Sequence, residues 1–84
     1  MKTTQYFDER VLSKRPEIDP AWCLQIITSP LHTEVQADGR IRFWGEVTLR
    51  GEDEPRIMRV VTLEDGETIH NAFLDRSFRR MATS

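Results

Sequence analysis

The sequence of 84 residues is short of cysteine and of long apolar runs. Because Cys23 is the only cysteine, an internal disulfide and a metal site built from several cysteines are excluded. No run of eighteen apolar residues occurs, so we expect no membrane-spanning helix. The opening stretch MKTTQYFDER lacks the apolar core of a signal peptide. We therefore expect a single cytoplasmic domain over residues 1–84.

A large excess of charge of one sign is also missing. Twelve basic and fourteen acidic side chains leave a net charge of −2, whereas domains that bind nucleic acid broadly are usually basic. Ten of the twelve basic residues are arginine, the side chain better suited to bidentate contacts with carboxylate or phosphate groups. The arginines fit either ordinary surface ion pairs or a localised anion site.

Motifs for metals and common cofactors are absent as well. The two histidines, His32 and His70, lie far apart, and the acidic residues at 52–54 share one loop, which suits solubilising charge better than an ion cage. No glycine-rich phosphate loop and no nucleophile elbow occurs. We expect neither a metal site nor a cofactor.

Two short helices are predicted in the N-terminal third of the chain. Within residues 6–14, Phe7 and Val11 lie four apart, on one helical face, and Pro16 ends this segment. The second helix begins at Asp19-Pro20, because aspartate can cap free N–H groups and proline fits the first turn. Ser29-Pro30 ends it. Cys23 lies on its apolar stripe and is expected in the core.

From residue 31 onward the apolar period changes to two, which predicts strands at 33–36, 41–49, 57–63 and 68–74. Asp38-Gly39 and Asp65-Gly66 are hairpin signals, because both residue types tolerate positive φ. Strands joined by two-residue turns are antiparallel neighbours. The predicted fold is α+β, with two N-terminal helices on one face of a three- or four-stranded antiparallel meander. We also expect a short C-terminal helical turn that begins at Asp75.

A two-residue turn at Asp65-Gly66 would fix the register of the last hairpin. Residues on opposed positions share a side of the sheet, so the register predicts that the side under the helices holds Met58, Val60, Ile69 and Phe73. The open side then collects Arg42, Trp44, Arg59 and His70. A one-residue slip or a bulge would invert this assignment.

An arginine, a histidine and an aromatic side chain on one sheet face suit single-stranded RNA and its cleavage. His70 can exchange a proton near neutral pH, Arg59 can stabilise a phosphate-like charge, and Trp44 can stack on a base. Each residue also has a structural interpretation. His70 can be a packing residue of its strand, Arg59 can pair with Glu46 or another strand carboxylate, and Trp44 can be half-buried in the core.

Three segments resemble a family of small bacterial proteins of unknown function. They are VLSKRPEID at 11–19, GRIRFWGEV at 39–47 and RVVTLEDGETIHNAFLDRSF at 59–78. In size, element order and strand pattern, that family is similar to the RelE/ParE and BrnT toxin-like fold, and the resemblance extends from residue 6 to residue 78. It implies a toxin of a toxin–antitoxin pair, neutralised by a partner peptide and often active as a ribosome-associated ribonuclease. It also implies a cationic site at Arg42, Arg59, His70 and Arg76. Such ribonuclease toxins are generally basic, whereas this chain is slightly acidic.

Two hypotheses follow from the sequence. The first is a toxin-like, mRNA interferase-like endoribonuclease, with His70 and Arg59 catalytic and with Arg42, Trp44 and Arg76 binding the substrate. Its partners would be RNA and an antitoxin. The second is a non-catalytic protein-binding or homodimerising module that uses the open sheet face or an edge strand as its interface. Neither hypothesis involves a membrane.

Overall fold

The computed structural model describes residues 1–78, and they form the predicted α+β fold. Residues 5–14 are helical and include the π-helical stretch η1 (Phe7–Val11) and the α-helical turn α1 (Leu12–Lys14), and α2 (Pro20–Thr28) follows. One antiparallel sheet has the order β1 (His32–Val35), β2 (Ile41–Val47), β3 (Arg56–Thr62) and β4 (Ile69–Leu74). No helix within residues 1–78 has the length and apolar character needed to cross a bilayer.

Both helices begin where side chains satisfy free backbone N–H groups. The Thr4 hydroxyl accepts a hydrogen bond from the Phe7 amide at 3.1 Å. An N-cap hydroxyl accepts in the same way from the amide three residues later. Asp19 caps α2 by accepting from the Ala21 amide at 2.9 Å, and Pro20 occupies the first helical position, as predicted.

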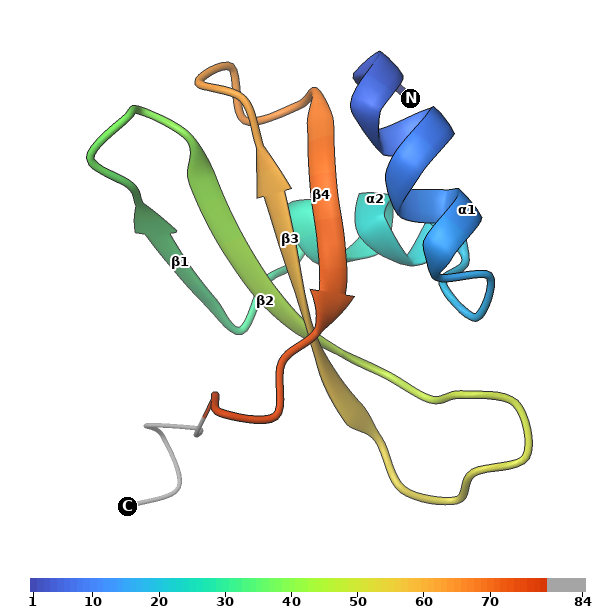
Figure 1. The fold of residues 1–84 in the computed structure, drawn as a ribbon. Coiled ribbons are helices and arrows are strands. Elements are labelled where there is room, and N and C mark those ends of the chain that lie inside the picture. Colours follow the sequence, from blue (N-terminus) through green and yellow to red (C-terminus); the bar gives the residue numbers. More distant parts are fainter. Residues whose placement is uncertain (79–84) are drawn as a thin grey trace.

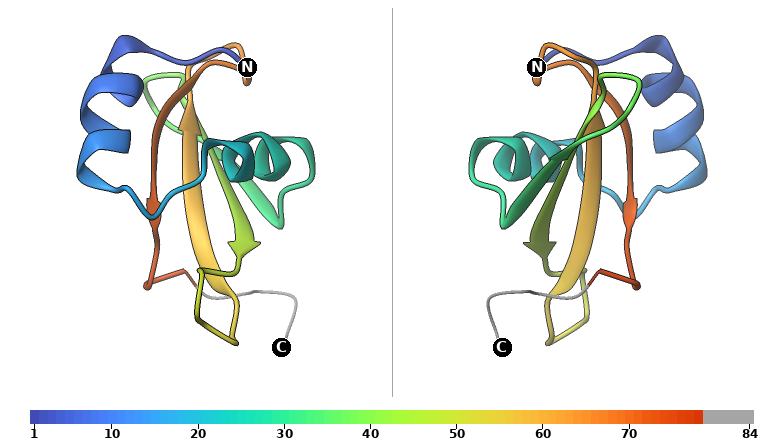
Figure 2. Two further views of the ribbon diagram at one scale, coloured as in Figure 1. Left: turned by 90° about the vertical axis from the view of Figure 1, so that its right-hand side faces the viewer. Right: turned by 90° about the vertical axis from the view of Figure 1, so that its left-hand side faces the viewer.

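The two helices take different places against the sheet (Figures 1 and 2). Helix α2 crosses one face, against β2 and β3, whereas η1 lies beside the outer edge of β4. Their apolar side chains nevertheless meet in one core. The core residues are Phe7, Val11, Ile18, Cys23 and Ile26 from the helical part, and Phe43, Val47, Met58, Val60, Ile69 and Ala72 from the sheet.

The residues before the first helix extend the sheet for a short distance. The carbonyl of Lys2 accepts from the Ile69 amide at 2.9 Å, and the Thr4 amide donates to the Ile69 carbonyl at 3.0 Å. These two bonds form an isolated parallel bridge between Thr3 and Ile69. The start of β4 is therefore fixed to the start of the chain.

The predicted register of the last hairpin is wrong beyond the pair of Thr62 and Ile69. Thr62 does face Ile69, but Val61 then pairs with Asn71 instead of His70, because a β-bulge interrupts the ladder at this point. The extra residue reverses the sides of the rest of β4. Ala72 is fully buried in the core, and Phe73 lies on the open side against Arg59, contrary to the prediction.

The segment after β4 is a hydrogen-bonded turn. Asp75 Oδ1 accepts from the backbone amides of Ser77 at 3.0 Å and Phe78 at 3.2 Å. Asp75 thus caps this turn. A C-terminal helical turn, however, is not seen within residues 1–78.

Candidate anion-binding site

A pocket of about 270 Å³ lies on the open face of the sheet. Its lining residues are polar or aromatic apart from one valine, and none of those described is acidic: Tyr6, Gln36, Arg40, Arg42, Arg59, Val61, His70, Asn71 and Phe73. Three of the four residues predicted for this face, Arg42, Arg59 and His70, thus share one pocket. We call this the arginine pocket.

Arg42 enters the arginine pocket from the middle of the sheet. The side-chain amide of Gln36, turned so that its oxygen faces Arg42, accepts from Nη2 at 2.8 Å and from Nε at 2.7 Å. The ion pairs of Arg42 and Arg40 with carboxylates are long. Arg42 Nη1 lies 3.9 Å from Glu34, and Arg40 Nη1 lies 3.8 Å from Asp38. These half-exposed pairs hold the guanidinium groups weakly and leave donors for a ligand.

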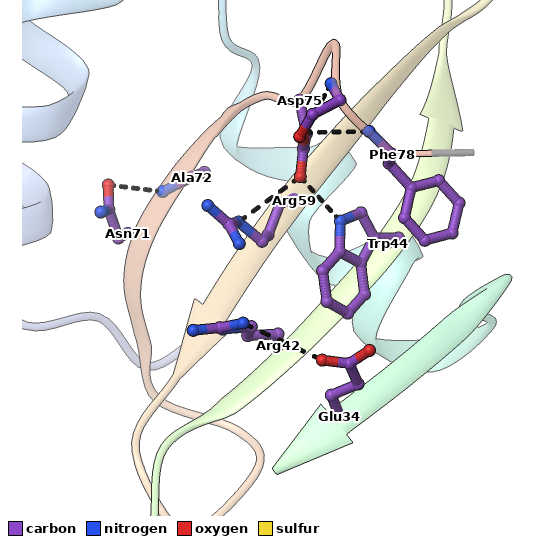
Figure 3. A network of polar contacts seen from close by, with 9 residues as sticks. Glu34, Arg42, Trp44, Arg59, Asn71, Ala72, Asp75 and Phe78 are labelled. Atoms are coloured by element: carbon purple, nitrogen blue, oxygen red, sulfur yellow. Dashed lines mark hydrogen bonds and ion pairs between the residues drawn. The ribbon is translucent and has the colours of Figure 1, made fainter. Parts of the chain in front are cut away.

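Arg59 is the most enclosed of the three arginines (Figure 3). Its Cζ lies 4.3 Å from the ring centroid of Phe73 and 5.8 Å from that of Trp44. Its Nε lies 3.8 Å from Asp75 Oδ2, and this buried atom has no hydrogen-bond partner within residues 1–78. The carboxylate near Arg59 Nε is thus that of Asp75, from the turn after β4 and not from a strand, and 3.8 Å is too long for a hydrogen bond to this donor.

His70 lies at the bulge and is held by the start of the chain. Its Nδ1 lies 3.0 Å from the Thr4 hydroxyl oxygen, and its ring stacks on Tyr6 with centroids 4.9 Å apart. Burial, and then the Arg40 guanidinium, lower the pKa of His70 below its ordinary value. The imidazole is therefore neutral at pH 7, with Nε2 as the nitrogen not engaged by Thr4.

Trp44 does not offer the free stacking surface expected of it. The side chain is only 4% exposed. Phe78 stacks on it at 5.2 Å between centroids, and His32 packs against it at 5.3 Å. Its Nε1 donates to Asp75 Oδ2 at 3.0 Å (Figure 3). The ring is on the predicted face, but the chain itself covers it.

Arg76 lies apart from the other predicted site residues. It is exposed in the turn after β4 and does not line the arginine pocket. The lining residues that the sequence did not indicate include Tyr6, Arg40 and Phe73. Arg40 could have been found, because it lies two residues before Arg42 and so has the same strand parity. Phe73 depends on the bulge, and Tyr6 depends on where the first helix docks.

Comparisons of the chain with protein-family models, with curated proteins and with solved structures found no match. The resemblance to toxin-like proteins therefore stays a prediction. Within residues 1–78, no group of three or more histidine, cysteine or acidic side chains could hold a metal ion. The chemistry of the site is that of guanidinium groups around a neutral imidazole.

Proposed function

We propose that this protein is a toxin-like endoribonuclease that holds a phosphodiester of single-stranded RNA in the arginine pocket. The observation that carries the proposal is the convergence of Arg40, Arg42, Arg59 and His70 on one pocket that no acidic residue among 1–78 lines. A pocket with that lining suits an anion, and arginine forks match phosphate geometry.

The guanidinium groups have donors to give to a phosphate. The carboxylate pairs of Arg40 and Arg42 are at 3.8 and 3.9 Å and half-exposed, so they compete weakly with a bound anion. Arg59 is more enclosed, with its side chain 25% exposed, and its Nε is unpartnered within residues 1–78. A phosphate oxygen at Arg59 would satisfy a donor that Asp75 leaves unsatisfied.

His70 supplies the base that RNA cleavage needs. The neutral imidazole Nε2 takes the proton of the ribose 2′-hydroxyl, and the resulting oxygen attacks the phosphorus held by the arginines. The P–O2′ bond forms and the P–O5′ bond breaks. The leaving 5′-oxygen takes a proton from water, which gives a 2′,3′-cyclic phosphate and a 5′-hydroxyl end. The arginines stabilise the extra negative charge on phosphorus in the transition state.

The test is expression of the protein with matched variants, followed by RNA cleavage with and without ribosomes. We expect the wild type to arrest growth and to leave 2′,3′-cyclic phosphate ends. His70→Ala should lower the cleavage rate by about 10²-fold or more while RNA still binds. Arg42→Ala should weaken RNA binding by roughly tenfold, since it removes charge-assisted hydrogen bonds.

Arg50→Ala is the matched control, because Arg50 is exposed in the β2–β3 loop and does not line the arginine pocket. It should keep growth arrest, binding and cleavage at the wild-type level. A wild-type protein that is harmless, and that cleaves no RNA with or without ribosomes, would contradict the catalytic proposal.

A second candidate function, a non-catalytic protein-binding or homodimerising module, is favoured by the edge of β1. Within residues 1–78 this strand pairs only with β2, and the side chain of Val35 at its end is 71% exposed. Exposed edge strands accept a strand from another chain. Val35→Lys should then dissociate a dimer or a bound partner in sedimentation equilibrium, whereas a wild type that is monomeric and binds no partner would contradict this candidate.

A further inference from the structure

An aromatic cluster lies beside the arginine pocket and has no part in the proposed cleavage. Trp44 is stacked by Phe78 with an interplanar angle of 21°, and His32 approaches both rings, at 5.3 Å from Trp44 and 6.0 Å from Phe78. His32 and Trp44 are opposed residues of β1 and β2, so the sheet itself positions them. Phe78, in contrast, comes from the turn after the last strand (Figure 3).

The same turn places a carboxylate against the cluster. Asp75 Oδ2 accepts from Trp44 Nε1 at 3.0 Å and lies 3.8 Å from Arg59 Nε. Its side chain is 8% exposed, and its Oδ1 holds the amides of Ser77 and Phe78. Residues 75–78, which we call the closing segment, thus present an anion and an aromatic ring together to the open face.

We infer that Trp44 and His32 form a nucleobase subsite which the closing segment occupies. The Phe78 ring stands where a base stacks, and the Asp75 carboxylate stands where a phosphate oxygen meets Arg59. The inference rests on the proposed function and deepens it, because it names how a nucleotide next to the held phosphodiester is bound and why the subsite is closed without RNA.

Arg59 connects the two parts of the site. It lines the arginine pocket and also lies near both Trp44 and Asp75. A base and a phosphate joined through one ribose would therefore contact Trp44 and Arg59 together. Every base has a π-face that can replace the Phe78 ring, and base stacking on aromatic side chains depends little on sequence. Exchange of the closing segment for a nucleotide retains both kinds of contact.

The test uses Trp44 fluorescence in a Trp22→Phe background, so that Trp44 is the only tryptophan. Each variant is titrated with a five-residue oligo(U) RNA, with inorganic phosphate, and with the blocked peptide Asp-Arg-Ser-Phe. Phe78→Ala should expose Trp44 to acrylamide quenching, and RNA should restore its protection. It should also tighten RNA binding by roughly twofold to tenfold, the fold-change that corresponds to one lost aromatic pair.

Three controls isolate the subsite from the rest of the molecule. Inorganic phosphate should gain no affinity from Phe78→Ala, because the change leaves Asp75 in the chain beside Arg59 and phosphate has no base to stack on Trp44. Adding Trp44→Leu to Phe78→Ala should abolish the gain in RNA affinity, measured by labelled-RNA anisotropy. Leu24→Ala, at an exposed position of α2, should change the affinity for neither RNA nor inorganic phosphate. If Phe78→Ala fails to fold, Phe78→Leu replaces it. Leucine keeps most of the side-chain bulk but has no ring to stack on Trp44, so this variant should also bind RNA more tightly.

The outcomes separate this inference from the proposed function. Equal or weaker RNA binding by the folded Phe78 variants, with phosphate binding retained, would overturn the nucleobase subsite and leave the arginine pocket intact. If the Phe78 variants bind the peptide Asp-Arg-Ser-Phe more tightly but not RNA, the nucleobase subsite is overturned in favour of a peptide site. Loss of both RNA and phosphate binding in the parent protein would remove the proposed function and the inference together.

Discussion

At the scale of single residues, His70 is defined by its neighbours on three sides. The Thr4 hydroxyl lies 3.0 Å from Nδ1, Tyr6 stacks on the ring, and Arg40 lowers the pKa further than burial alone does. Thr4 and Tyr6 hold the ring in one orientation, and Arg40 favours its neutral form. A neutral imidazole among arginines has a free ring nitrogen and can therefore accept a proton, and the imidazolium that forms adds to the positive charge around the phosphate.

The first prediction concerns the titration of His70. Its pKa, followed by NMR, should lie below the ordinary histidine value of about 6.5. Arg40→Gln removes a repulsive cation and should raise that pKa, whereas Arg50→Gln should not. The cleavage rate should be constant above pH 7 and fall as the pH drops through the His70 pKa. A His70 that titrates at or above the ordinary value would contradict this account.

The same depressed pKa also affects stability. The unfolded chain binds the proton of His70 at a higher pH than the folded chain does. The stability contributed by the neutral ring is therefore fully present above the ordinary pKa. It is lost as the pH falls through the lower pKa of the folded state.

At the scale of elements, α2 lies very close to the sheet at Gly45. A Cβ placed on Gly45 would come 2.6 Å from Ile26 Cγ1, a buried atom close to the backbone of α2. A real side chain at this position would push the helix away from β2, or force Ile26 out of its rotamer. The absence of a side chain at Gly45 is thus what allows α2 to cover β2.

The second prediction follows from that contact. Gly45→Ala should lower the free energy of unfolding by about 1–3 kcal/mol, the usual cost of overpacking, as measured by urea denaturation. In an Ile26→Ala background the same change should cost less, because the atom it meets is gone. An equal cost in both backgrounds would show that Ile26 is not the obstacle.

Elements were predictable from the sequence where their signals are local. Asp19-Pro20 starts α2 through a cap that involves only residues two apart, and Gly39 and Gly66 take positive φ at the predicted hairpins. The bulge in β4 has no such local signal. Beyond the bulge, Ala72 lies in the core, and before it, Ile69 is hydrogen-bonded to Lys2 and Thr4 at the start of the chain. These contacts join residues that are far apart in the sequence.

At the scale of the whole molecule, the candidate site is assembled from segments far apart in the sequence. Strand alternation, with the register set by the two hairpin signals, predicted that Arg42, Arg59 and His70 would share one face. It could not predict Tyr6, whose place depends on the first helix lying beside the edge of β4 instead of across the sheet. Nor could it predict that Phe78 would cover Trp44, because a turn after the last strand has no register to follow.

The third prediction uses Cys23 as a reporter of the whole fold. The thiol is fully buried, and burial raises its pKa to about 12. A disulfide reagent at pH 8 should therefore label the native protein only through unfolding, at least ~10³-fold more slowly than it labels the chain in guanidinium. Ser13→Cys in a Cys23→Ala background places an exposed thiol on the first helix and should react at full speed. Rapid labelling of native Cys23 would contradict the packed core.

The hydrogen bonds that join Thr4 to Ile69 and His70 also mean that the candidate site cannot form until both segments have been synthesised. The ribosome makes residues 4–6 before residues 69–78, and Thr4 and His70 are 66 residues apart in the chain. A nascent chain that ends before His70 carries the arginines of β2 and β3 but has no imidazole among them. For an enzyme proposed to act on RNA, the proposed activity would thus arise only after His70 has been made and has reached Thr4.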